Sequence, residues 1–97
     1  MVKKRISMNG QITIPRTIQR LLDINDGDYL CIYYNTNKEI IIDTIQNDNQ
    51  LNLCIYRYGK VSIPSEIRRF MNIDLGSYLD MEISKDKRKV HLSKSNF

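Results

Sequence analysis

The segment GQITIPRTIQRLLDINDGDYL, residues 10–30, decides how this chain folds. A near copy, GKVSIPSEIRRFMNIDLGSYL, begins forty-nine positions later (59 − 10 = 49) and ends at residue 79. The identical residues include those that shape a backbone: Gly10 with Gly59, Pro15 with Pro64, and Gly27 with Gly76. We interpret the pair as an internal duplication. Because units of under about fifty residues rarely bury enough apolar surface alone, each copy is expected to need a partner.

Both copies show the alternation of polar and apolar residues that is typical of half-buried strands. Strands are expected over 3–7, 11–14, 29–34 and 39–44 in the first copy, and over 53–56, 60–63, 78–83 and 89–93 in the second. The predicted organisation is repeat 1 over residues 1–44, a polar linker over 45–51 and repeat 2 over residues 52–97.

A short amphipathic helix is expected before the final strand pair of each copy. Pro15 suits its first position, where the missing N–H costs nothing and φ already has the helical value. Ile18, Leu21 and Leu22, matched by Ile67, Phe70 and Met71, have the spacing of one buried face. Each copy thus reads as a βαββ unit, and the chain is predicted to be mainly β with short helices.

Composition and motifs exclude several classes of function. The longest apolar runs are too short to span a bilayer and the N-terminal residues lack the apolar stretch of a signal peptide, so a cytoplasmic location is expected. Cys31, Cys54 and His91 have no second ligand at metal-binding spacing, and no metal or cofactor is expected. Phosphate loops and serine elbows are missing from the sequence, which argues against an enzyme or a small-molecule substrate.

The run of strand, glycine, strand ending in Ile-Pro, helix, glycine turn and hairpin resembles the AbrB, MazE and SpoVT swapped-hairpin family of prokaryotic DNA-binding proteins. Gly10 through Asp28 carries this resemblance in the first copy, and Gly59 through Ser77 in the second. In that family two βαββ units interleave their hairpins into one barrel whose two-fold face binds DNA. The resemblance therefore implies a swapped-hairpin β-barrel and a regulator that binds double-stranded DNA at the nucleoid.

Basic residues gather on the early strands and the helix of each copy, where phosphates would be bound. A net charge of +4 permits nucleic-acid binding without requiring it. The residues expected to contact DNA are Lys3, Lys4, Arg5, Gln11, Arg16, Gln19, Arg20, Arg57, Lys60, Arg68 and Arg69. Neither copy has the full basic set, so either both contribute to one composite surface or one has lost DNA contact. The alternative to DNA binding is that these residues are solvated charges on exposed helices.

Two assemblies fit the duplication. In a homodimer each copy pairs with the same copy of another chain; in a single-chain pseudo-dimer the two copies pair with each other. Outward positions of the third strand and its neighbour are apolar in the first copy, which makes Tyr29, Cys31, Tyr33 and Ile41 a candidate interface. We favour the homodimer because the copies differ in surface character.

Function is weighed between two main classes. The leading interpretation is a double-stranded DNA-binding transcription regulator of the AbrB type. The alternative is a MazE-like antitoxin, which binds a toxin partner and its own operator. Such antitoxins usually have a tail after the barrel, and residues 93–97 are short for that purpose, which favours the regulator. A purely structural module is the third possibility.

Overall fold

Two matching halves make up the part of the chain that the computed structural model describes, residues 1–44 and 52–95. The first half contains strands β1 (Val2–Arg5) and β2 (Gln11–Thr13), helix α1 (Arg16–Leu22), and strands β3 (Tyr29–Tyr34) and β4 (Ile40–Asp43). The second contains β5 (Leu53–Ile55), β6 (Lys60–Ser62), α2 (Ser65–Phe70), β7 (Tyr78–Ile83) and β8 (Lys89–Lys94). The mainly β fold with short helices is confirmed. The predicted linker, 45–51, lies outside the described residues.

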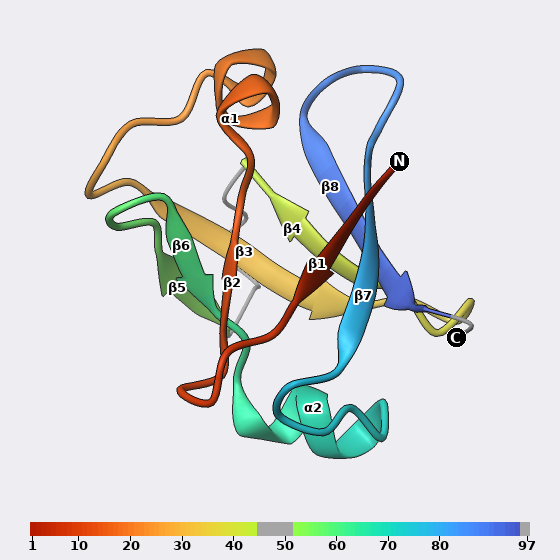
Figure 1. Ribbon diagram of the computed structural model, residues 1–97. Helices are drawn as coiled ribbons and strands as arrows, with labels where there is room; N and C mark the ends of the chain where they lie inside the picture. Colours follow the sequence, from red (N-terminus) through yellow and green to blue (C-terminus); the bar gives the residue numbers. More distant parts are fainter. Residues whose placement is uncertain (45–51, 96–97) are drawn as a thin grey trace.

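Strands of one half pair with strands of the other. The larger sheet is antiparallel with the order β1-β7-β8-β4-β3-β5, and β2 pairs with β6 in a separate ladder. Thus β1 adds to the hairpin of the second half, β5 adds to the hairpin of the first, and β4 joins β8 (Figure 1). This is the pairing of the single-chain alternative. The homodimer, in which like copies pair between two chains, stays a prediction. The covalent connection favours the single-chain pairing, because it keeps the two halves at high effective concentration.

An internal two-fold axis relates the halves. Ile12 lies directly opposite Val61 in the β2–β6 ladder, and these residues hold the same place in the two copies. Ile41 and His91 form the equivalent pair in the β4–β8 ladder. Hydrogen bonds follow the same symmetry: the amide of Ile14 donates to Gly59 O and that of Ile63 to Gly10 O, both at 2.9 Å. The axis therefore runs from the small ladder to the centre of the large sheet.

The short helices bury fewer residues than their apolar stripe predicts. Ile18 and Leu22 of α1 are buried, but Leu21, expected beside them, is 44% exposed. In α2 the matching residue, Phe70, is 61% exposed, and its ring stacks on Tyr34 with centroids 4.2 Å apart. Helices of seven and six residues cover only a narrow strip of core, so residues at the edge of the stripe stay accessible.

The candidate interface of the first half is largely covered within the chain itself. Cys31 is 0% and Ile41 3% exposed, which contradicts their expected place on an accessible patch. Tyr33 is half-buried and its hydroxyl donates to Asp43 Oδ2 at 3.2 Å; burial and the Asp43 carboxylate raise the pKa of this phenol. Only Tyr29 of the predicted set is exposed.

Candidate nucleic-acid interface

The β2–β6 ladder presents a polar ribbon on the surface of the barrel. Ile12 and Val61 point inward and are buried, while Gln11, Thr13, Lys60 and Ser62 occupy the outward positions. In Figure 1 the two strands lie in front of β3, and α1 and α2 lie at opposite ends of them. Strict alternation over three residues on each strand places these four side chains on one face.

A tight turn before β6 positions basic and aromatic groups beside this ribbon. Arg57 and Lys60 exchange backbone hydrogen bonds of 3.0 Å, so only Tyr58 and Gly59 form the turn, both with positive φ. The amide of Tyr58 donates to Asp26 Oδ1 at 2.6 Å, which anchors the turn and leaves the Tyr58 side chain 84% exposed. Burial raises the pKa of Tyr56, next to the turn, and the Asp26 carboxylate raises it further.

Several residues predicted to contact DNA line shared hollows. Gln11, Arg57 and Lys60 line a shallow hollow of about 390 Å³ together with the ribbon residue Ser62. Arg16, Gln19 and Arg20 line another, of about 420 Å³, beside α1. The first hollow therefore joins Gln11 of the first half to two cations of the second, and the other combines two cations of α1 with the carboxylate of Asp23.

Two predicted DNA contacts have a structural role instead of a free side chain. The Nε2 amide of Gln19 donates to Ile14 O at 2.6 Å, and the guanidinium Nε of Arg68, forty-nine positions later, donates to Ile63 O at 3.0 Å. Both side chains are half-buried, so neither extends freely into solvent. The neighbouring Arg69 is exposed.

Each of these two side chains also covers a turn glycine of the other half. A Cβ atom on Gly10, where φ is +79°, would lie 3.1 Å from the Arg68 guanidinium, and one on Gly59 would lie 3.3 Å from Gln19 Nε2. Glycine thus serves two purposes here, because it adopts the left-handed conformation and admits the close approach of a side chain from the opposite helix.

The basic first strand divides its cations between two faces. Lys3 and Arg5 are exposed, whereas Lys4 shares the inward register of its partner Leu79 and is half-buried. The Arg5 guanidinium donates to Gly76 O at 3.0 Å and lies 5.9 Å from the Tyr78 ring. Lys3, Lys4 and Arg5 therefore do not form one continuous basic stripe.

Exposed residues that sequence reasoning left out also border the ribbon. Thr13 and Ser62 share its outward face, and Met8 lies on the exposed turn before β2. The alternation over 11–13 and 60–62 contained the signal for Thr13 and Ser62, since it places them on the same side as Gln11 and Lys60. Hydroxyl and amide groups of this kind hydrogen-bond to bases and phosphates.

Within residues 1–44 and 52–95, no three His, Cys, Asp or Glu side chains gather in a way that would hold a metal ion. Neither helix within those ranges has the length and apolar composition that crossing a membrane requires.

A family model described as "Antidote-toxin recognition MazE, bacterial antitoxin" matches residues 3–50. The solution structure of PHS018 from Pyrococcus horikoshii matches with a TM-score of 0.55 and 19% identity, over 99% of this chain and 94% of that one, which supports the fold alone. A search of curated proteins found no match. Residues 3–50 thus match the MazE antitoxin family, and the chain has the mainly β, barrel-type fold of AbrB and MazE proteins.

Proposed function

We propose that this protein is a double-stranded DNA-binding transcription regulator of the AbrB type, in which two tandem units form one single-chain barrel. The observation that carries the proposal is the polar β2–β6 ribbon with Arg16, Arg57 and Lys60 exposed beside it. Phosphate contacts supply most of the affinity of such proteins, because each neutralised phosphate releases counterions. The family match over residues 3–50 supports a DNA-binding regulator or antitoxin of the same superfamily.

A two-stranded ribbon such as β2–β6 suits the major groove of B-DNA. That groove is about 12 Å wide and admits a two-stranded β-ribbon. In this arrangement the outward side chains of Gln11, Thr13 and Ser62 face base edges, since amides and hydroxyls both donate and accept hydrogen bonds. The cations at the margins reach the phosphates on either side of the groove and set the position of the protein on the duplex.

The test is a fluorescence-anisotropy titration with a mixed pool of promoter-length duplexes at several salt concentrations. The Arg16→Ala/Arg57→Ala/Lys60→Ala variant is expected to bind more weakly and to lose about 2.7 from the slope of log K against log salt, at about 0.9 for each phosphate contact. Removing the same charge from the β7–β8 tip, in Lys85→Ala/Lys87→Ala/Arg88→Ala, provides the matched control. Equal losses in both variants would refute the ribbon as the binding surface, and no binding at low salt would refute the proposed function.

A MazE-like antitoxin is the second candidate, because the matching family model describes toxin recognition. An antitoxin would hold a toxin protein in addition to its operator. Affinity purification of the tagged protein from its host, followed by mass spectrometry, should then recover a stoichiometric toxin whose growth inhibition the protein reverses. Recovery of promoter DNA without such a partner would favour the regulator.

The homodimer remains a prediction that can be measured separately. A barrel completed within one chain should be stable as a monomer of 11.5 kDa, whereas a dimer of barrels would have twice that mass. Size-exclusion chromatography with light scattering distinguishes the two. We also propose that the protein acts in the cytoplasm at the nucleoid.

A further inference from the structure

We infer that the barrel binds DNA in a single orientation and recognises a duplex site without two-fold symmetry. This inference rests on the proposed function and deepens it, because it names the class of DNA site. Symmetric dimers that bind DNA recognise palindromic sites, since the operator reflects the two-fold axis of the protein. Here the backbone has such an axis but the side chains around it differ.

The axis passes through the middle of the proposed DNA surface. Ile12 and Val61 are opposite one another and equivalent, so a half-turn about their midpoint exchanges the two ends of the ribbon. One end, where Thr13 pairs with Lys60, leads into α1; the other, where Gln11 pairs with Ser62, leads into α2. We call these the α1 end and the α2 end.

Three equivalent positions have a cation at the α1 end and a neutral side chain at the α2 end. The pairs are Arg57 with Met8, Lys60 with Gln11, and Arg16 with Ser65. All three cations are exposed. The acidic residues differ as well: the α2 end has Glu66 where α1 has Thr17, whereas the α1 end has Asp26 and Asp28 where the α2 end has Leu75 and Ser77.

Two cations near the α2 end stand where the α1 end has the neutral residues Gln19 and Cys54. Arg68 and Arg5 each donate to a backbone carbonyl, of Ile63 and Gly76 respectively, at 3.0 Å, which holds each guanidinium in place without removing its charge. Arg20 and Arg69 are equivalent, exposed and present at both ends, so they cancel in the comparison. The two ends therefore present different patterns of charged side chains, with three exposed cations at the α1 end where the α2 end has neutral residues.

The turns at the two ends differ as well. Before β6 the bonded residues are Arg57 and Lys60, whereas before β2 the amide of Ser7 donates to Gln11 O at 2.8 Å and encloses one residue more. DNA turned by a half-turn about the axis would thus meet a different charge pattern and a different surface shape. The strongest phosphate contacts are expected on one half of the site, and the sequence preference on the two halves should differ.

The test first selects bound duplexes from a random pool and then maps the orientation of the protein on the selected sequence. Thr17 and Glu66 are equivalent and exposed, on α1 and α2 respectively, so Thr17→Cys and Glu66→Cys form a matched pair of labelling sites. The native Cys31 and Cys54 are buried, which directs an iron-chelate cleavage reagent to the new thiol. We expect a non-palindromic consensus, with the Thr17 label cutting one flank and the Glu66 label the other.

The expected preference for one flank is about fivefold or more, comparable to the effect of a single mismatched base pair. A second variant tests the cause: Met8→Arg/Gln11→Lys/Ser65→Arg introduces the three cations of the α1 end at the α2 end and should reduce the difference in cleavage between the two flanks. A palindromic consensus, or equal cleavage of both flanks by the original protein, would overturn this inference while leaving DNA binding intact. Failure to bind DNA at low salt would instead overturn the proposed function.

Discussion

Replacing Arg68 measures how much its hydrogen bond and packing contribute to the stability of the protein. Its Nε donates to Ile63 O at 3.0 Å, and its guanidinium covers Gly10 from the opposite helix. Arg68→Ala removes this hydrogen bond and the packing of the side-chain stem, at an expected cost of about 1–2 kcal/mol of unfolding free energy. Arg68→Gln should cost far less, because Gln19 makes the same bond to Ile14 O at the equivalent position.

Thermal and urea denaturation of the two variants measure the difference. For a domain of this size about 1 kcal/mol corresponds to a fall in Tm of about 4–8 °C, so Arg68→Ala should melt well below Arg68→Gln. Arg69→Ala, on the exposed side of the same helix, is the control and should melt close to the original protein. The reasoning would be refuted if the Ala and Gln variants at position 68 were equally destabilised, or if both were as stable as the original protein.

Three further perturbations test individual contacts. Burial raises the pKa of the Cys54 thiol from 9.0 to about 11, so keeping this thiol neutral contributes about 2–3 kcal/mol to stability below pH 9, and that contribution is lost as the pH rises to about 11. Urea titrations at pH 8 and 11 should show this loss for the original protein and not for Cys54→Ala. Asn35→Ala should weaken the β3–β4 turn by about 1–2 kcal/mol. It should also reduce the stability lost at acid pH, because the Asn35 amide is the largest of the causes that lower the pKa of Glu39; chemical denaturation at pH 7 and 3 would show an unchanged acid loss if this is wrong. A double-mutant cycle of Phe70→Ala and Tyr34→Ala should give a coupling of about 0.5–1.5 kcal/mol for the stacked rings, and additive effects would contradict it.

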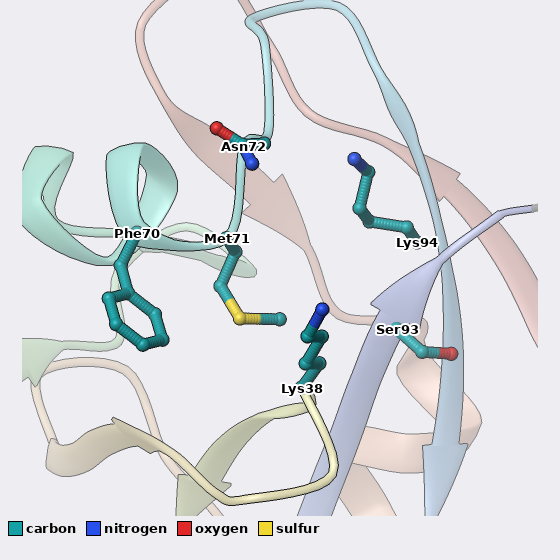
Figure 2. A pocket seen from close by; sticks show the side chains of 6 residues that line it. All are labelled: Lys38, Phe70, Met71, Asn72, Ser93 and Lys94. Carbon is teal, nitrogen blue, oxygen red and sulfur yellow. The ribbon is translucent and has the colours of Figure 1, made fainter.

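The Phe70→Ala variant also tests whether the DNA-binding surface extends to the pocket beside the stacked rings. Phe70 and Met71 line a cavity of about 400 Å³, which Lys38 enters from the β3–β4 turn and Lys94 borders from β8 (Figure 2). None of the four outward ribbon residues lines this pocket. DNA binding by Phe70→Ala should therefore match that of the original protein, and a loss of affinity would show that the binding surface extends to this part of the barrel.

Most of the local structure was readable from the sequence because its signals act over a few residues. The expected strands over 29–34 and 78–83 agree with β3 and β7 at both ends. Helix starts were misplaced by one residue, since Pro15 and Pro64 precede α1 and α2 with ψ of 147° and 144° instead of forming the first helical residue. The fixed φ of proline suits both the residue before a helix and its first residue, so the sequence pattern alone does not distinguish these two positions.

The candidate site was predicted less completely than the local structure, because some of its side chains make contacts between distant elements. The basic residues around the ribbon were identified from charge, and Arg57 and Lys60 do lie together with Gln11. Charge alone did not show that Arg68 is bound to a carbonyl of its own half while covering a glycine of the other. Such contacts join elements whose separation in space depends on the complete fold.

By itself, the sequence determined the repeated unit, its strands and turns, and the need of each copy for a partner, because periodicity and glycine placement are local properties of the chain. Tertiary structure alone decided which partner that is: β1 pairs with β7 and β5 with β3 inside one molecule. Strand edges present the same backbone donors and acceptors to any partner, and the apolar faces of the two copies are nearly alike. The choice therefore depends on the proximity of the halves and the packing of the whole core, which no single segment encodes.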